Sequence, residues 1–303
     1  MKITKGKQRR AQRVVIYGVE SVGKSTFAAN FPAPLFLDVE GGTAHLDVDR
    51  AEVGNMADLD AAIAECGTTQ YQSIIIDSID WTERLLIDAL LAESKKKSIE
   101  DWGYGKGWVQ VAERMSRLLN SLDQLIAKGK NVVLIAHSKV QRVEPPDLLA
   151  AYDRYELKLS KQCSPLVKEW ADELWFFRFK TKAIQSESGR AKGIGGKERI
   201  ILTTHSAAYD AKTRSGLAEE LPMVWESVSH LFSAQPAAAA SSPDVPAWQF
   251  RLEEKAEQVN AFLRGKSVIS ADQTWRDAPQ KALDRIAADP GAFLSKVAEW
   301  GAA

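Results

Sequence analysis

The chain has 303 residues, of which 45% are hydrophobic and 26% charged, the balance of a soluble globular protein with one full-sized domain and room for a small second one. Lysine plus arginine and aspartate plus glutamate each number 40, so net charge indicates no anionic partner, although local clusters of charge still can. Without a run near the ~20 apolar residues of a membrane helix, and with only two distant cysteines, Cys66 and Cys163, we expect a cytoplasmic protein that makes no membrane contact.

Short apolar, β-branched runs alternate with helical patterns along the first half of the chain. Residues 14–17 predict a buried strand that ends at a glycine, and a loop and a helix over about 24–30 follow it. Further buried strands are predicted at 34–39, 73–77 and 131–136, and helices at 56–66, 81–91 and 108–126. This alternation predicts an α/β fold with a doubly wound parallel sheet.

Beyond residue 138 the pattern becomes less regular. Strands at 173–179 and 199–204 flank a polar, glycine-rich stretch, which predicts a hairpin with a mobile tip. About three short helices are predicted near the C-terminus, the last capped by Asp289 with Pro290 in its first turn. The predicted organisation is a basic N-terminal arm (1–12), an α/β core (13–232), a flexible linker rich in proline, alanine and serine (233–246) and a helical C-terminal module (247–303).

The loop Gly18-Val-Glu-Ser-Val-Gly-Lys-Ser25 matches the pattern G-x-x-x-x-G-K-[ST] in full. Its glycines let backbone N–H groups turn toward phosphate oxygens, and the next helix adds the positive end of its dipole. Lys24 is expected to reach the β- and γ-phosphates and Ser25 to ligate Mg²⁺. The strand before the loop and the helix after it favour this reading over a glycine turn without a ligand. The sequence therefore predicts a site for ATP and Mg²⁺ built from Gly18, Val19, Glu20, Ser21, Val22, Gly23, Lys24, Ser25 and Thr26.

Asp77 ends the predicted strand 73–77. A carboxylate at the carboxyl end of a strand beside a phosphate loop is where a Walker B aspartate holds Mg²⁺ and its water shell. An apolar run that ends in aspartate is common by itself, and a plain strand-end cap is the alternative. In combination with the loop, the pattern predicts that Ser25 and Asp77 are the metal ligands.

With its parts in this order, the chain resembles the RecA family. The resemblance implies that Glu40, which follows the second strand, is the base that orients and activates the attacking water. His137, after the fourth strand, stands in the place of that family's γ-phosphate sensor, where glutamine is more usual. The alternatives are an acidic residue that solvates the turn before Gly41 and a simple strand-end histidine.

The segment Ala211-Lys-Thr-Arg-Ser-Gly-Leu217 resembles the K-x-R/K-x-G segment by which RecA-like and hexameric-helicase-like subunits insert two cations into a neighbour's ATP site. Such cations meet the charge that develops on the γ-phosphate. Lys212 and Arg214 are two residues apart, so both point the same way if the segment is extended. A solvated basic turn is the alternative. The resemblance implies self-assembly into a ring or filament, with the ATP site shared between subunits.

Within this superfamily the chain resembles phage ATP-binding proteins of the core-only RecA-like type, which act in single-strand annealing and recombination. The resemblance covers about residues 11–223 and rests on the stretches 98–108, 135–137 and 211–217. It implies ATP-dependent action on single-stranded DNA in the host bacterial cytoplasm. A single-strand-binding or replication protein is a further expected partner, through the C-terminal module. A hexameric helicase, a small-molecule P-loop kinase (for which we find no clear lid) and a nucleotide-gated adaptor protein are the alternatives.

Local composition indicates where single-stranded DNA would bind. Residues 95–108 mix cations with aromatic side chains, which suits a loop that neutralises phosphates and stacks bases: Lys95, Lys96, Lys97, Trp102, Tyr104, Lys106 and Trp108. A solvated helix end with core aromatics is the alternative. The basic N-terminal arm, continued by Arg13, and the hairpin tip at 190–199 are further candidates. Residues 138–161 are a fourth, although Glu144 and Asp147 dilute their charge.

Overall fold

A computed structural model describes residues 5–6, 10–144, 150–185, 191–232, 252, 255–270 and 273–301. The chain divides into two compact units, Met1–Ala238 and Ala239–Ala303, and each has a hydrophobic core of its own. Several predicted features lie outside the described residues: the linker 233–246, the start of the hairpin tip at Arg190, Asp147, and Lys2, Lys7 and Arg9 of the basic arm.

The first unit is built on a mostly parallel sheet. The strands that the structure describes are β1 (Arg13–Gly18), β2 (Pro34–Asp38), β3 (Asp49–Glu52), β4 (Ser73–Asp77), β5 (Asn131–Val143), β6 (Tyr152–Leu157), β7 (Glu173–Gln185), β8 (Ala191–Leu202), β9 (Lys212–Thr213) and β10 (Glu220–Pro222). The parallel strands lie in the order β7-β1-β5-β4-β2-β3, and β8 and β10 extend the sheet antiparallel beyond β7. The predicted fold class, an α/β fold with a doubly wound, mostly parallel sheet, is confirmed.

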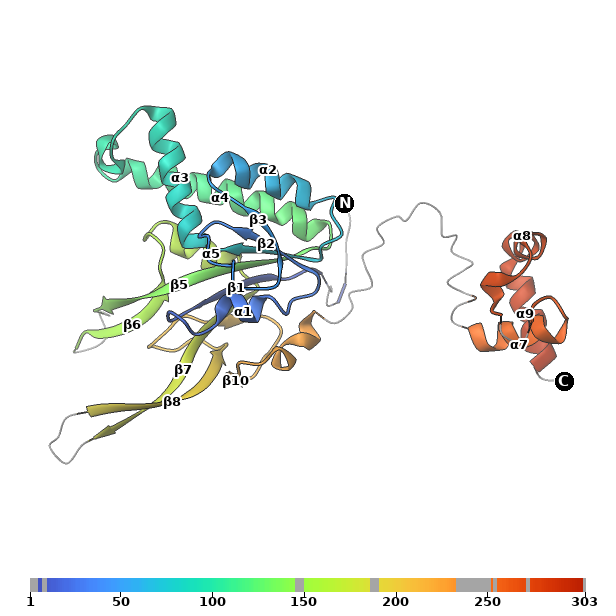
Figure 1. The fold of residues 1–303 in the computed structure, drawn as a ribbon. Coiled ribbons are helices and arrows are strands. Elements are labelled where there is room, and N and C mark those ends of the chain that lie inside the picture. The colour runs from blue at the N-terminus through green and yellow to red at the C-terminus, as the bar shows by residue number, and fades with distance from the viewer. Residues whose placement is uncertain are drawn as a thin grey trace. The chain divides into compact units, whose positions relative to one another are not determined.

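Helices cover both faces of this sheet (Figure 1). One face carries α2 (Met56–Cys66), α3 (Ile79–Ser94), α4 (Lys106–Ala127) and α5 (Cys163–Trp170). The other carries α1 (Lys24–Ala28) and the short 3-10 turns η2 (Trp225–Ser227) and η3 (Ser229–Leu231). Alternate residues of β1 belong to different cores, Val15 and Tyr17 on the α4 side and Val14 and Ile16 on the α1 side. This explains why the strand is apolar throughout.

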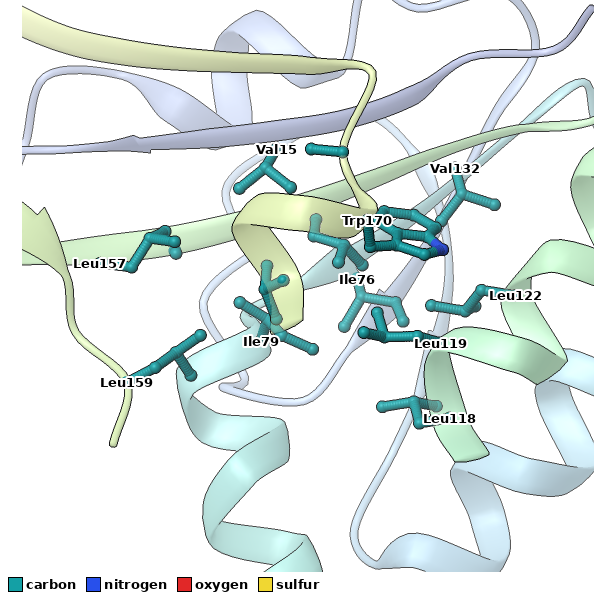
Figure 2. Close-up of a cluster of buried hydrophobic side chains, with 14 of the residues drawn as sticks. Val15, Ile76, Ile79, Leu118, Leu119, Leu122, Val132, Leu157, Leu159 and Trp170 are labelled. Atoms are coloured by element: carbon teal, nitrogen blue, oxygen red, sulfur yellow. The ribbon is translucent and has the colours of Figure 1, made fainter. Parts of the chain in front are cut away.

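The larger core lies between the sheet and α3, α4 and α5. Figure 2 shows leucines of α4 near strand residues and near Trp170 of α5; the labelled residues are Val15, Ile76, Ile79, Leu118, Leu119, Leu122, Val132, Leu157, Leu159 and Trp170. The predicted helix at 108–126 is therefore confirmed, since its apolar residues at steps of three and four form the buried face of α4.

Two strands continue past the carboxyl edge of the sheet. In β5, residues 138–143 pair with β6 alone, and in β7 the residues from Thr181 onward pair with β8 alone. The predicted strand ends at 136 and 179 were too early, and residues 191–197, expected in a mobile tip, belong to β8. The run of apolar residues used to predict these strands stops early, because a two-stranded arm has no face covered by a core and so carries polar residues.

The second unit is a small helical module. It contains α7 (Ala256–Gly265), the 3-10 turn η4 (Trp275–Asp277), α8 (Gln280–Ala288) and α9 (Pro290–Gly301). Its core includes Val259, Leu263, Trp275, Ile286, Leu294 and Val297. The predicted cap of the last helix is confirmed, because Asp289 Oδ1 accepts a hydrogen bond from the Ala292 N–H. In neither unit does a described helix have the length and apolar character needed to span a membrane.

Candidate nucleotide-binding site

The parallel strands bring most of the predicted site residues to one edge of the sheet. In the strand registers, Gly18 is the partner of His137 and Asp38 is the partner of Asp77. Glu40 follows Asp38 by two residues. The phosphate loop, Glu40, Asp77 and His137 therefore meet at the carboxyl ends of β1, β2, β4 and β5. This edge is where open α/β sheets bind ligands.

The loop between β1 and α1 has glycine where the backbone requires it. A Cβ atom at Gly18 would lie 2.2 Å from the carbonyl oxygen of Phe177 on β7, so a larger residue would collide with the neighbouring strand. Gly23, the residue before α1, has a φ of 98°, a left-handed conformation that glycine adopts readily. Val22 is buried in the core on the α1 side. Packing therefore fixes both ends of the loop, while its middle is exposed.

The side chain of Lys24 folds back over the loop. Its Nζ donates hydrogen bonds to the carbonyl oxygens of Gly18 (3.3 Å) and Val19 (3.1 Å), and the residue is only 7% exposed. Burial lowers the pKa of Lys24, and the carboxylates of Asp77 and Asp80 oppose that effect. The ammonium group is thus held at the loop by carbonyl dipoles, which phosphate oxygens can replace.

Ser25 and Asp77 are in direct contact. The Ser25 hydroxyl donates a 2.5 Å hydrogen bond to Asp77 Oδ2. Asp77 is 6% exposed, and burial raises its pKa to about 6 although the hydrogen bond from Ser25 opposes this. Mg²⁺ binds oxygen ligands and usually takes one or two from protein, with waters and phosphates completing the shell. This pair fits that ion. Among the described residues, no group of three acidic, histidine or cysteine side chains could hold a metal by itself.

Glu40, Ser78, His137 and Asp80 form a chain of polar contacts beside this pair. Ser78 Oγ donates to Glu40 Oε2 at 3.2 Å, and Glu40 Oε1 lies 3.9 Å from His137 Nε2. On the other side of the ring, His137 Nδ1 lies 3.0 Å from Asp80 Oδ2. The hydrogen bond that the His137 ring donates to Asp80 raises the pKa of His137, and the same carboxylate accepts the His137 backbone N–H. Asp80 therefore orients the imidazole toward Glu40.

Asp80 was missed in the sequence analysis. It lies in the first turn of α3 and is 5% exposed. A signal was present, because Asp80 follows Asp77 by three residues and the first turn of a helix after a strand remains close to the strand end. An aspartate in a first helical turn is also a common favourable residue for the helix dipole, which is why it did not stand out.

Asp38, also missed, shapes the turn that carries Glu40. Its carboxylate accepts hydrogen bonds from the backbone N–H groups of Gly41, Gly42 and Thr43 and from the Thr43 hydroxyl. Burial raises the pKa of Asp38, but these hydrogen bonds outweigh it and hold the pKa below its ordinary value. The turn is therefore fixed from within, and Glu40 is presented by a rigid segment.

An arginine of the same chain also reaches the phosphate loop. Arg199, at the end of the β8 arm, donates from Nη1 to the carbonyl oxygen of Val22 at 3.1 Å. The same nitrogen lies 2.7 Å from the position of a Cβ atom on Gly23. From the sequence, Arg199 was predicted only to begin a strand and to belong to a DNA-binding tip, because its contact with the loop depends on the pairing of β8 with β7.

Lys212 and Arg214 are not brought to this site. They lie at the opposite edge of the sheet, where β9 pairs with the first residues of β7. Lys212 Nζ donates to the carbonyl oxygen of Lys168 at 2.7 Å, and Arg214 Nη1 pairs with Asp172 at 2.7 Å. A role for these cations at an ATP site would therefore require the site of a neighbouring subunit.

The segment 95–108 only partly matches the expected DNA loop. It joins α3 to α4 through the 3-10 turn η1 (Ile99–Trp102), in which the Asp101 side chain accepts the backbone N–H groups of Lys97 and Ser98. Trp102 and Trp108 are partly buried and pack against the core, which agrees with the alternative of core aromatics, while base stacking by these rings stays a prediction. The segment folds back on its own helices, which covers these rings. Tyr104 is fully exposed, with a φ of 48°.

Two other segments predicted to bind DNA also differ from the expected structure. Arg10 pairs with Asp172 at 2.8 Å, and Arg13 pairs with Asp123 at 2.8 Å, so neither belongs to a free basic arm. Residues 138–143 and 152–157 form the β5–β6 hairpin rather than a loop, with Val140 exposed on it.

Comparison with known proteins identifies the family of the first unit. A family model described as an AAA domain matches residues 10–215. The chain belongs to this AAA domain family. The matched part of the AAA domain includes the phosphate loop, Glu40, Asp77 and His137. No curated protein matches the chain. Among solved structures, the flagellar accessory protein FlaH from Methanocaldococcus jannaschii is similar at 12% identity and a TM-score of 0.35, over 70% of this chain and 84% of that one.

Proposed function

We propose that the protein hydrolyses ATP with Mg²⁺ at the carboxyl edge of its sheet. The observation that carries this proposal is the 2.5 Å contact between Ser25 and Asp77 beside a complete phosphate loop. Ser25 and Asp77 would hold Mg²⁺, which would supply positive charge to neutralise the charge that develops on the phosphate oxygens. Lys24 binds the β- and γ-phosphates, and the backbone of residues 18–26 surrounds them.

Glu40 is the base in this proposal. It accepts a proton from the attacking water, and Ser78 and His137 hold its carboxylate in place. His137 stands next to Glu40 and senses the γ-phosphate through the same ring nitrogen, Nε2, that faces the glutamate. Arg199 adds a cation of the same chain on the outer side of the loop. Lys212 and Arg214 are proposed to act in the site of a neighbouring copy, which makes the active unit a ring or filament.

Single-stranded DNA is the proposed partner, in strand annealing during phage recombination or replication. The support is the tip between α3 and α4, where the fully exposed Tyr104 lies among the exposed lysines Lys95, Lys97 and Lys106. Glycines on both sides of Tyr104 have positive φ angles, 68° at Gly103 and 72° at Gly105. A lone exposed ring among cations suits base stacking with phosphate neutralisation.

Binding of fluorescent oligo(dT) with an ATP analogue tests this partner. Affinity should fall with salt at a log–log slope near −0.7 per phosphate neutralised. Charge reversal of Lys95, Lys97 and Lys106 should flatten the slope, and Tyr104→Ala should weaken binding about tenfold. Lys128→Glu, at the other end of α4, is the matched control and should change neither the salt slope nor the affinity for oligo(dT). No binding, or a flat salt dependence, would remove DNA as the partner and leave the nucleotide-gated adaptor. Unwinding of a forked duplex would identify a helicase instead.

A further inference from the structure

The helical C-terminal unit contains a groove that its own fold leaves open. The groove has a volume of about 530 Å³ and lies among α7, α8 and α9. Its apolar lining includes the core residues Leu263 and Ile286 and the partly buried Phe262 and Phe293. A groove of this size that reaches core side chains can accept one or two apolar side chains of a partner.

Cations surround this apolar lining. Lys266 follows α7, Lys281 and Arg285 belong to α8, and Lys296 belongs to α9; all four are exposed. Within the residues that the structure describes, none of the four is in an ion pair. The acidic residue found in the described lining is Asp289, and one of its oxygens already caps α9. The surroundings of the groove are therefore strongly positive.

The aromatic rings of the groove are poorly arranged for stacking nucleic-acid bases. Phe262 packs edge to face with Phe293, with ring centroids 5.7 Å apart and planes at 82°. It makes a second edge contact with Trp300 at 5.8 Å. Base stacking needs an open ring face, whereas these rings are held against each other. The groove is better suited to inserting side chains than to stacking bases.

We propose that this groove binds an acidic peptide segment of a partner protein. An aromatic or branched aliphatic side chain of the segment enters the apolar lining, and its carboxylates pair with Lys266, Lys281, Arg285 and Lys296. The apolar anchor supplies affinity and the charges supply specificity and speed of association. The site lies in the second unit, so it does not depend on the function proposed for the first.

The full-length protein can be tested with a fluorescein-labelled peptide of aspartates around one phenylalanine and one leucine. We expect saturable binding by fluorescence anisotropy. Alanine in place of both apolar residues of the peptide should weaken binding at least about tenfold, because charge alone would remain. The double variant Lys281→Glu, Arg285→Glu should weaken it at least as much. Lys255→Glu, on an exposed cation of the same unit outside the groove lining, should leave affinity within about twofold.

Three results would overturn the proposal. One is the absence of saturable binding by the wild-type protein. Another is equal binding of the alanine peptide, which would mean nonspecific charge attraction. The third is oligo(dT) binding that depends on Lys281 and Arg285 while the peptide does not bind, which would make the groove a nucleic-acid site. Circular dichroism of the double variant checks that it is folded. We expect it to be folded, because both charge reversals are at exposed positions of α8.

Discussion

The Ser25 hydroxyl donates a 2.5 Å hydrogen bond to Asp77 Oδ2, across 52 positions of sequence. This contact joins the phosphate loop to the end of β4. It also leaves a carboxylate in a buried position, where burial raises its pKa to about 6. The site therefore contains a negative charge that a cation can neutralise, and several testable properties depend on it.

Replacing Asp77 with asparagine should stabilise the metal-free protein at neutral pH. The pKa of Asp77 is about 6 when folded and about its ordinary 3.8 when unfolded, so the folded state holds the proton more tightly. Stability from this group is present at low pH and is lost as pH rises from 3.8 through 6. The difference corresponds to about 3 kcal/mol at most, at about 1.4 kcal/mol per pKa unit.

Urea unfolding at several pH values measures this effect. Asp77→Asn should exceed wild type in stability at pH 7.5, and the gap should close toward pH 4. Asp88→Asn, an exposed residue of α3, is the control and should show no such trend. With Mg²⁺ and an ATP analogue present, wild type should become more stable than Asp77→Asn, because only the carboxylate binds the metal well. A pH-independent difference between the two proteins would show that Asp77 does not titrate in this range.

Lys24→Ala should abolish ATP binding and leave the fold intact. Within the described part of the chain, the hydrogen bonds of the ammonium go to backbone carbonyls of its own loop, so its loss removes a cation without opening the core. A decrease in affinity of at least about a hundredfold, or about 2.7 kcal/mol, is expected by calorimetry. Lys128→Ala is the control. Retention of wild-type affinity would contradict the nucleotide site itself.

Glu40→Gln should keep ATP bound and stop its hydrolysis. The amide preserves the size of the side chain and its contact with Ser78, but it cannot take a proton from water. Nucleotide affinity by calorimetry should match wild type, while turnover of bound ATP falls. If turnover stays within about tenfold, a change in barrier below about 1.4 kcal/mol, another group is the base.

Asp80→Asn should lower the pKa of His137. The carboxylate of Asp80 raises that pKa because it accepts a hydrogen bond from Nδ1, so an uncharged amide should move the titration to lower pH. NMR titration of the His137 ring measures this shift, with exposed His205 as an internal control. ATP hydrolysis should fall while ATP affinity stays the same. An unchanged His137 titration would show that Asp80 does not position the ring.

A feature of this structure could be predicted from the sequence where the sequence pattern reflects a local physical requirement. The phosphate loop and the strands around it were predictable, because glycine spacing and doubly apolar strands reflect local backbone needs and burial on both faces. Arg199 was not, since its contact with the loop depends on the pairing of β8 with β7, and Asp80 was overlooked because an acidic residue is common in a first helical turn. The packing of Trp102 and Trp108 against the core could not be predicted, because composition alone does not tell whether a ring faces solvent or its own helices.

Arg214→Ala and Lys24→Ala subunits, each inactive alone, should partly restore ATP hydrolysis when they are mixed. The geometry motivates this test: Arg214 pairs with Asp172 at the amino edge of the sheet, opposite the phosphate loop of its own chain. It can therefore act on a phosphate only in a neighbour. Loss of Arg214 leaves Asp172 paired with Arg10, so the variant is expected to fold.

In a mixed assembly, some interfaces combine the intact loop of the Arg214→Ala chain with the intact Arg214 of the Lys24→Ala chain. These interfaces contain every catalytic group, so activity should rise with their frequency. Arg199 provides the contrast, because it contacts the loop of its own chain. An Arg199→Ala subunit carries a defective loop region, and mixing it with Lys24→Ala should restore nothing. If a verified mixed assembly of Arg214→Ala with Lys24→Ala shows only background activity, Arg214 is not donated to a neighbour. If mixing Arg199→Ala with Lys24→Ala restores ATP hydrolysis, Arg199 acts in the site of a neighbour instead of its own.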